Sequence, residues 1–489
     1  MEKRFVYADN AATTPLSEIA FNAMKPWLTE HYGNPSSLYR MGREAKEAIN
    51  EARKVVGKCL NAAMPVNEKN DYAPGEILFT GGGSQADNLA IRGFMHGPSS
   101  KGRKHIITSK IEHHAVLYTC EALEKEGFRV TYLNVDKEGH VDLEQLKREL
   151  SEDTALVSIM AANNEIGTIQ PLKQISELAH SVGAKFHTDA VQAVGHMHID
   201  VQEMGIDMLS LAGHKFRGPR GTGVLYVKNG IQLEPLVYGG GQERGMRPGT
   251  EAVPNIAAFA KACEIRMAHF DEDYAHVQEL ADYLKQQVSA ELPDAVINGE
   301  GDIPPVVNLS MPGCKSEVML HVLEGDEVYI SSGSACSKGK QSGVLKALGL
   351  PKTRTDSALR VSFAPFNTKE DVDAFRSGQE GRKNVQTLTV RNVDGGASYE
   401  EIVCFQHPHL LWLHRTDFPA ALYCVWRRAA EKSGLCRAVL RRLDRACCRL
   451  FRHAGAGDSS AECCARSTAA TAVLHPFRQR SVRHHRGSV

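Results

Sequence analysis

The stretch Ile206-Asp-Met-Leu-Ser-Leu-Ala-Gly-His-Lys-Phe216 decides the fold class of this 489-residue chain. Its first half is a short apolar run typical of a buried strand, and Gly213, Gly218 and Gly221 predict that the strand ends in a loop at Lys215. Open α/β sheets carry their chemistry at such strand ends. A partly desolvated lysine there loses its proton readily and can form a Schiff base with a cofactor aldehyde.

The wider pattern of apolar runs agrees with an α/β fold. Between residues 77 and 227, short strand-like runs alternate with helix-like runs, which predicts a mostly parallel sheet. A long helical pattern starts near Pro254, and strands around Val306–Leu309 and Arg360–Ser362 predict a smaller domain after it. The length leaves room for two or three domains and for a large core.

If the aldehyde is that of pyridoxal 5'-phosphate (PLP), its pyridine nitrogen needs a carboxylate partner. The run Lys185-Phe-His-Thr-Asp189 reads as a second strand that ends in such a carboxylate, 26 residues before Lys215. Gln192 follows and would donate to the phenolic oxygen of PLP. The alternative for Asp189 is a cap on the next helix.

The phosphate and the ring of PLP need further groups. Gly81-Gly-Gly-Ser84 follows the apolar run Ile77–Thr80 and predicts a phosphate-binding turn with Ser84 at the N-cap of a helix. Glycine triplets are more often simple turns. His113 and His114 follow the run Ile106–Ser109 and offer an imidazole to stack on the ring, although a histidine near a strand end more often has a structural role.

Residues 6 to about 375 resemble the cysteine desulfurases of the NifS/IscS family, class V aminotransferase-type enzymes that bind PLP. The motifs that match in order and spacing are Tyr7-Ala-Asp-Asn-Ala-Ala-Thr-Thr-Pro15, Gly33-Asn-Pro-Ser-Ser37, Glu112-His113, Asn163-Asn-Glu-Ile-Gly167, His187-Thr-Asp-Ala-Val-Gln192, Gly213-His-Lys215, Gly239-Gly-Gly-Gln-Glu-Arg-Gly-Met-Arg-Pro-Gly-Thr250 and Ser331-Ser-Gly-Ser-Ala-Cys336. The resemblance implies the PLP-dependent transferase fold of the aspartate-aminotransferase type, with a seven-stranded, mostly parallel sheet and a small C-terminal α/β domain.

The resemblance also implies a role for each candidate residue. Lys215 would be the Schiff-base lysine, Asp189 the partner of the pyridinium, and His113, rather than His114, the ring-stacking acid and base. Arg360 would pair with the carboxylate of the substrate L-cysteine, since a guanidinium binds carboxylates through two donors. The other implied contacts, none of them to a metal, are Asn164 to cofactor or substrate, Gln192 to the cofactor, Gly83, Ser84 and His214 to its phosphate, and Thr250 to the phosphate of the other subunit in a homodimer.

Cys336, on a Gly/Ser-rich segment, is the implied nucleophile. Its thiolate would attack the sulfur of L-cysteine and leave L-alanine and a persulfide. The persulfide would pass to an acceptor such as an iron–sulfur scaffold, a tRNA-thiolation enzyme or a cofactor pathway, and the sequence does not choose among them. A selenocysteine lyase would use the same residues, although the loop around Cys336 resembles the desulfurases more. Four other cysteines read as small buried thiols, Cys59, Cys120, Cys263 and Cys314.

Two positions depart from the family pattern. Ala212 stands where relatives often carry a hydroxyl that binds the phosphate, and Ser84 stands where threonine is frequent. The first departure removes one hydrogen bond to the phosphate, which is worth on the order of 1 kcal/mol. The segment after Cys336 is also shorter than in some relatives, which bears on the acceptor protein that it reaches.

The resemblance divides the chain into four parts: an N-terminal segment (1–15) that packs with the small domain, a large PLP-binding domain (16–254), a small domain (255–376) with the Cys336 loop, and a tail (377–489). The first residues have no apolar stretch of signal-peptide length, and no apolar run approaches the roughly 18 residues of a membrane span. We therefore expect a cytoplasmic enzyme with no membrane contact.

The tail differs in composition from the rest of the chain. Through residue 376 the chain has 24 Lys and 16 Arg against 49 acidic residues, a net charge of −9. From residue 377 it has 2 Lys and 16 Arg against 9 acidic residues, a net charge of +9, and 7 of the 12 cysteines. The formal net charge of zero is therefore a cancellation between two unlike parts.

Three interpretations of the tail remain. A zinc module is disfavoured because the adjacent pairs Cys447-Cys448 and Cys463-Cys464 do not suit zinc geometry. A basic nucleic-acid arm would make the chain a weakly catalytic nucleic-acid or partner-binding protein, but there is little aromatic interleaving after Trp426 and no readable motif. We favour out-of-register coding that begins after Phe375-Arg376, because arginine, cysteine, alanine and histidine rise together while lysine falls. We therefore expect no nucleic-acid partner.

Overall fold

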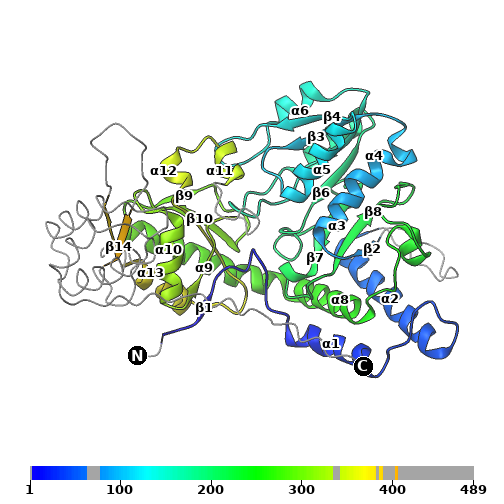
Figure 1. Cartoon of the computed structure of the whole chain (residues 1–489), viewed down its shortest axis with the longest axis horizontal. Coiled ribbons are helices and arrows are strands. Elements are labelled where there is room, and N and C mark those ends of the chain that lie inside the picture. Colours follow the sequence, from blue (N-terminus) through cyan, green and yellow to red (C-terminus); the bar gives the residue numbers. More distant parts are fainter. Residues whose placement is uncertain (1–2, 63–76, 334–341, 381–384, 389–401, 406–489) are drawn as a thin grey trace, which may run out of the picture. The chain divides into compact units, whose positions relative to one another are not determined.

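The computed structural model describes residues 3–62, 77–333, 342–380, 385–388 and 402–405 (Figure 1). The chain divides into two compact units, Met1–Gln379 and Glu380–Val489. In the second unit the structure describes one antiparallel pair of strands, β13 (Val385–Leu388) and β14 (Ile402–Phe405). The three interpretations of the tail rest on cysteines and arginines that mostly lie outside the described residues. Every candidate site residue belongs to the first unit, and Cys336 alone among them falls outside the described ranges.

Seven strands form the central sheet of the first unit, in the order β2-β8-β7-β6-β5-β3-β4. Neighbours from β7 to β4 run parallel, whereas β8 pairs antiparallel with both β2 and β7. The predicted mostly parallel sheet of seven strands is therefore confirmed. The strands are β2 (Ile77–Thr80), β3 (His105–Ser109), β4 (Arg129–Leu133), β5 (Thr154–Ser158), β6 (Lys185–Asp189), β7 (Met208–Ala212) and β8 (Gly223–Val227).

Helices cover both faces of this sheet, as continuous apolar strands require. Successive residues of a strand face opposite sides, so Ile106 and Ile107 pack in different clusters of buried residues. The Ile107 cluster draws on α2 (Arg40–Cys59), α7 (Leu172–Ser181) and α8 (Val253–Ala268). The Ile106 cluster draws on α5 (His114–Lys125) and on the consecutive segments α3 (Gly83–Asn88), η1 (Leu89–Gly93) and α4 (Phe94–His96). Burial on both faces fixes the register of the strands that carry the site.

A second sheet, antiparallel and in the order β12-β10-β9, lies at the centre of the small domain. Its strands β9 (Val296–Asn298), β10 (Val306–Ser310) and β12 (Ala358–Ser362) include both strands predicted there. The surrounding core joins α9 (Phe270–Glu291), α10 (Ser316–Gly325) and α13 (Lys369–Glu380). Val6 and Ala8 of the N-terminal segment are buried in the same core, next to the parallel pair β1 (Val6–Tyr7) and β11 (Val328–Tyr329).

The remaining helical segments are mostly short connections. The helix predicted near Pro254 is α8, and its proline occupies the first turn, where a missing N–H costs nothing. No helix within the described ranges is long and apolar enough to cross a membrane. The other segments are α1 (Glu18–Thr29), η2 (Pro98–Ser100), α6 (Leu143–Glu149), η3 (Gly213–Lys215), η4 (Gln242–Gly245), α11 (Gly343–Ala347) and α12 (Lys352–Thr355).

Candidate active site

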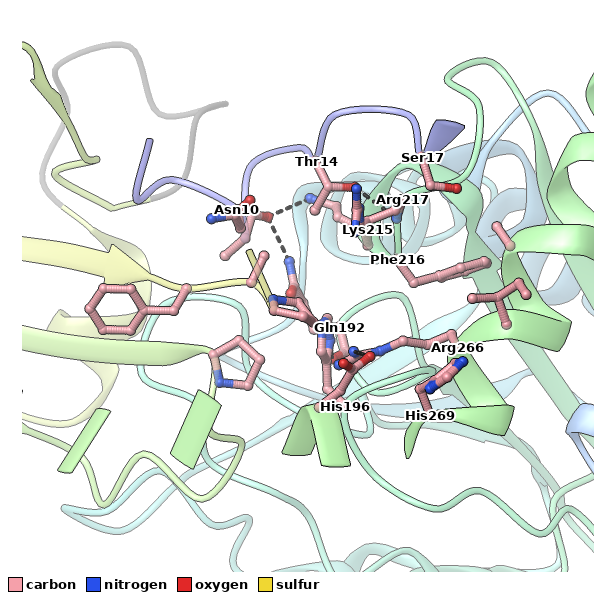
Figure 2. Close-up of a pocket in the computed structure, with 18 residues that line it drawn as sticks. Asn10, Thr14, Ser17, Gln192, His196, Lys215, Phe216, Arg217, Arg266 and His269 are labelled. Atoms are coloured by element: carbon pink, nitrogen blue, oxygen red, sulfur yellow. Dashed lines mark hydrogen bonds and ion pairs between the residues drawn. The ribbon is translucent and has the colours of Figure 1, made fainter. Parts of the chain in front are cut away.

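Lys215 lies where the sequence predicts, in the short turn η3 that directly follows the buried strand β7. Its Nζ donates hydrogen bonds to the backbone oxygens of Ala11 at 2.6 Å and Ala12 at 3.0 Å. Gln192 is buried and donates from Nε2 to the same oxygen of Ala11 at 2.8 Å. Figure 2 shows Lys215 and Gln192 pointing toward the N-terminal segment. The N-terminal motif therefore covers the lysine.

A cavity of about 200 Å³ adjoins this lysine. Lys215 and Gln192 form part of its wall, and Arg217, Arg266 and His269 form another part (Figure 2). Asp189, His113 and the glycine turn do not line this cavity. Of the residues predicted to contact PLP, Lys215 and Gln192 therefore line this cavity, whereas Asp189, His113 and the glycine turn lie outside it.

Asp189 and His113 lie together at the carboxyl end of the sheet. Asp189 ends β6, is only 5% exposed, and accepts the N–H of Val191 at 2.9 Å through Oδ1. His113 is the N-cap of α5, and its Nδ1 accepts the N–H of Ala115 at 3.1 Å, so the neutral ring carries its proton on Nε2. One side-chain atom of each of Asp189, His113 and Asp87 lies within 4.8 Å of the other two. The structure thus brings together two predicted residues and one that was not predicted.

Burial sets the protonation of this pair. It raises the pKa of Asp189, and the His113 ring, the Val191 N–H and the Lys215 ammonium oppose that rise. Burial lowers the pKa of His113, against the pull of Asp189 and with the help of Lys215. His113 is accordingly a neutral base at pH 7, next to a carboxyl group that is shielded from water.

The glycine turn differs from the prediction in one respect. Ser84 is not the N-cap; α3 begins at Gly83, and Gly82 precedes it with a φ of +143°, a conformation that favours glycine. The N–H groups of Gly83, Ser84 and Gln85 make no hydrogen bond to a described residue. A Cβ added at Gly82 would meet no atom within 4 Å. Free amides and open space at a helix start fit a phosphate group.

Two residues outside this turn were also predicted to contact a phosphate, His214 in the same subunit and Thr250 in the other subunit of a dimer. His214 lies in η3, and its Nδ1 is 3.2 Å from the Oγ1 of Thr13. Burial lowers the pKa of His214 to about 4, so the ring is neutral at pH 7. Thr250 is exposed on the loop between η4 and α8. Ala212, at the end of β7, is buried and offers no hydroxyl. A Cβ added at Gly83 would lie 3.5 Å from the Cβ of Ala212.

Arg360 lies on β12 of the small domain and is 1% exposed. Its Nη2 pairs with Oδ1 of Asp9 at 2.7 Å, and its Nη1 donates to the backbone oxygen of Asn164 at 2.9 Å. Its Nε is buried and has no partner within the described residues. Burial raises the pKa of Asp9 although Arg360 opposes this. The guanidinium therefore keeps one donor without a partner among the described residues, beside a carboxyl group whose pKa burial raises.

Cys336 falls in the segment 334–341, outside the described residues, but both flanks of that segment are described. Ser331 and Arg360 exchange backbone hydrogen bonds of 3.1 and 2.6 Å. A Cβ at Gly333 would lie 3.4 Å from Oε2 of Glu165, and Ser342 donates to that same oxygen at 2.5 Å. The flanks are thus fixed near the predicted substrate-binding arginine.

Three of the four cysteines that we expected to be buried are buried. Cys120, Cys263 and Cys314 are buried, whereas Cys59, at the end of α2, is partly exposed. None of these cysteines forms a disulfide within the part of the chain that the structure describes.

Sequence reasoning missed two buried carboxyl groups, Asp87 and Glu112, and the partly buried carboxyl group of Asp9. Glu112 accepts the Oγ–H of Ser109 at 2.6 Å and the N–H of Met160 at 3.0 Å through Oε1, and burial raises its pKa to about 8. A signal for Asp87 was available, because it stands two positions before the apolar run Leu89-Ala-Ile91, and an aspartate in such a buried stretch is rare unless it is paired. Asp9 had no such signal, because its partner Arg360 is 351 residues away.

Comparisons with known proteins agree with this geometry. Residues 6–375 match the model of the family described as aminotransferase class V. A curated relative from Clostridium botulinum named cysteine desulfurase IscS is 46% identical over 374 residues, which cover 75% of this chain and 91% of the relative.

Two solved structures are similar over almost their whole length. A NifS-like protein superposes with a TM-score of 0.71 at 35% identity and covers 77% of this chain and 99% of its own. The structure titled "SspA in complex with cysteine" superposes with a TM-score of 0.63 at 34% identity and covers 74% of this chain and 100% of its own. The chain therefore belongs to the class V aminotransferase family and, within it, to the cysteine desulfurases of the NifS/IscS type.

Proposed function

We propose that this chain is a PLP-dependent cysteine desulfurase that converts L-cysteine to L-alanine and collects the sulfur on Cys336 as a persulfide. The observation that carries the proposal is the convergence of Lys215, Asp189 and His113 from three separate elements. That convergence lies at the carboxyl end of a mostly parallel sheet, where α/β enzymes place their chemistry.

Different residues of the site would bind different parts of PLP. Asp189 would pair with the pyridine nitrogen, Gln192 would contact the phenolic oxygen, and the free amides of Gly83 and Ser84 with His214 would hold the phosphate. When bound, PLP supplies an electron sink that weakens the bonds to the α-carbon of an amino acid. Thr250 is exposed, as a residue that completes the site of a second subunit must be, and we propose a homodimer.

Two residues would act on the substrate itself. Arg360 binds the carboxylate of L-cysteine, and its unpartnered Nε supplies a donor while Asn164 keeps the guanidinium in place through its carbonyl. His113 is neutral, with Nδ1 accepting the N–H of Ala115, so Nε2 carries the proton that the ring can donate at the substrate and later take back. Lys215 would leave Ala11 and Ala12 to act at the cofactor.

Cys336 would complete the reaction as nucleophile. Its thiolate attacks the sulfur of the substrate, the carbon–sulfur bond breaks, and the electrons of that bond leave with the carbon that becomes the methyl group of alanine. One L-cysteine and one Cys336 thiol thereby give one L-alanine and one persulfide. The persulfide would go to a sulfur-acceptor protein, and we propose a cytoplasmic setting without a nucleic-acid or membrane partner.

Alanine release from L-cysteine tests this proposal directly. The intact chain with PLP and a reductant should release alanine over many turnovers, and Cys336→Ala should lose nearly all of that release. The matched control Cys314→Ala removes a buried thiol of the same domain and should retain it. Full activity of Cys336→Ala would exclude the persulfide step and favour a selenocysteine lyase, which parallel assays with L-selenocysteine would then detect.

A further inference from the structure

A second buried carboxyl group, that of Asp87 on α3, lies beside Asp189. Its side chain is 1% exposed, and one of its atoms lies within 4.8 Å of atoms of Asp189 and His113. Its Oδ1 has no hydrogen-bond partner among the described residues. An ionised carboxylate in such a place carries a large desolvation cost, so its presence next to Asp189 needs a physical reason.

A chain of polar side chains crosses the sheet and ends at Asp87. The Oγ of Ser158 on β5 lies 2.8 Å from Nδ1 of His187, and Nε2 of His187 lies 3.0 Å from the Oγ of Ser210 on β7. Ser210 in turn hydrogen-bonds to Asp87. Burial lowers the pKa of His187 to about 3, so its ring is neutral, and the ring lies 3.9 Å from Asp87 without supplying a positive charge.

The groups around Asp87 and Asp189 have opposite effects on a negative charge. Asp87 faces the carboxyl groups of Asp189 and Glu112, and together with burial they raise its pKa well above the ordinary value. Burial also raises the pKa of Asp189. Three groups oppose this rise: the His113 ring, the N–H of Val191 and the ammonium of Lys215. Two buried carboxyl groups with atoms within 4.8 Å of each other disfavour a second negative charge, so the less stabilised of the two takes up a proton.

We propose that Asp87 is a positioning residue that holds a proton as a neutral carboxylic acid and so leaves Asp189 as the single negative charge beneath the site. The inference rests on the proposed pairing of Asp189 with the pyridine nitrogen of PLP. A neutral acid satisfies Ser210 without repelling the Asp189 carboxylate, and its side chain keeps that carboxylate in place. Asparagine has the same shape and no charge, so it should replace Asp87 well, whereas leucine should not.

Infrared difference spectroscopy of the full chain without PLP tests the protonation directly. At pH 7 the parent minus Asp87→Asn should show the carbonyl band of a protonated carboxyl group. Glu112→Gln is the matched control, because the pKa of Glu112 is raised to about 8 and its acid band must be told apart from that of Asp87. A carboxylate band in place of the acid band in the Asp87 difference would overturn the proposal, whether or not the chain binds PLP.

The second test measures PLP itself. The dissociation constant of PLP and the pH midpoint of its visible absorption should change less than about threefold and about 0.3 pH units in Asp87→Asn, and the constant should rise about tenfold or more in Asp87→Leu. Equal losses in both variants would show that the charge of Asp87 is needed, and no loss in either would show that it positions nothing; both results contradict the inference. If the leucine variant does not fold, the asparagine variant and the infrared band decide.

These outcomes separate the inference from the proposed function. A parent chain that binds no PLP would refute the proposed function, while the infrared band would still report the proton on Asp87. A parent that binds PLP and shows an ionised Asp87 would leave the desulfurase proposal standing and refute the inference.

Discussion

Ala212 leaves the proposed phosphate-binding turn without a side-chain hydroxyl at the end of β7. Its buried methyl group lies under Gly83, where the free amides of the turn begin. Ala212→Ser should therefore add one hydrogen bond to the phosphate and lower the dissociation constant of PLP about fivefold, the equivalent of about 1 kcal/mol.

Fluorescence titration with PLP would measure this change. The control Ala155→Ser places the same hydroxyl at a fully buried position of β5, away from the turn, and should not tighten binding. An unchanged or weaker affinity in Ala212→Ser would show that the phosphate does not approach this residue.

Among single residues, those whose position depends on the local sequence pattern could be predicted. Lys215 and Asp189 were found because apolar strands stop beside them, and strand ends are legible in a sequence. Ser84 was wrongly placed at the N-cap because Gly82 takes a positive φ and starts the helix earlier. Asp9 was missed because its partner Arg360 is brought near only by the folded chain, whereas Asp87 had a signal in the sequence that was overlooked.

Among the elements, the loop that carries the Gly239–Thr250 motif is tied to the sheet through Glu243. Both oxygens of Glu243 pair with Arg53 of α2, at 2.6 and 2.7 Å, and one also accepts the N–H of Phe79 on β2 at 2.9 Å. The side chain of Glu243 is 1% exposed and that of Arg53 is 11% exposed. Glu243→Gln should lower the free energy of unfolding by about 3 kcal/mol, because it leaves the Arg53 charge buried and unpaired.

Urea unfolding of this variant tests the contribution of the Arg53–Glu243 ion pair to stability. The double variant Arg53→Met with Glu243→Gln should recover much of the lost stability, since the unpaired charge is gone. Glu264→Gln, which breaks the exposed Lys261–Glu264 pair, should cost less than about 1 kcal/mol. A loss in Glu243→Gln no larger than that of the exposed control would contradict the role given to this pair.

Strand β3 supplies a prediction about pH. His105 is buried between Thr154 and Thr131, with ring nitrogens 2.8 and 3.0 Å from their hydroxyls, and burial with nearby Arg129 lowers its pKa to about 4. The unfolded chain takes up this proton near pH 6.5, so His105 lowers the stability of the fold as the pH falls from about 6.5 to about 4. His105→Gln should make that decline shallower, by up to about 1.4 kcal/mol per pH unit.

The measurement is the free energy of unfolding between pH 4.5 and pH 7 for both proteins. The surface residue His198, whose side chain is 71% exposed, provides the control His198→Gln, which should leave the slope as it is in the parent. A steeper decline in His105→Gln would reverse the sign predicted here.

For the molecule as a whole, the division after Gln379 predicts that catalysis does not need the tail. A chain that ends at Gln379 keeps nearly all of α13, and with it the buried Phe375 of the small-domain core. Its alanine release should stay within about twofold of the full chain, as expected of a unit with its own core. Loss of activity on truncation would contradict this, and RNA binding that weakens with salt and disappears on truncation would revive the nucleic-acid arm.

The overall architecture was predictable because alternating apolar runs specify a parallel sheet with helices on both faces. The order of its strands was not, since nothing in the local pattern states that β8 inserts antiparallel between β2 and β7. The contact of the N-terminal segment with Lys215 likewise joins residues more than 200 positions apart.

The central claim is that sulfur passes from L-cysteine to Cys336 at a cofactor held by Lys215. The most direct test is peptide mass spectrometry of the PLP-loaded chain after a single turnover with L-cysteine and no reductant. We expect one added sulfur atom on the peptide that contains Cys336, and no addition in Lys215→Ala. Alanine release with unmodified Cys336, or sulfur on another cysteine, would contradict the account.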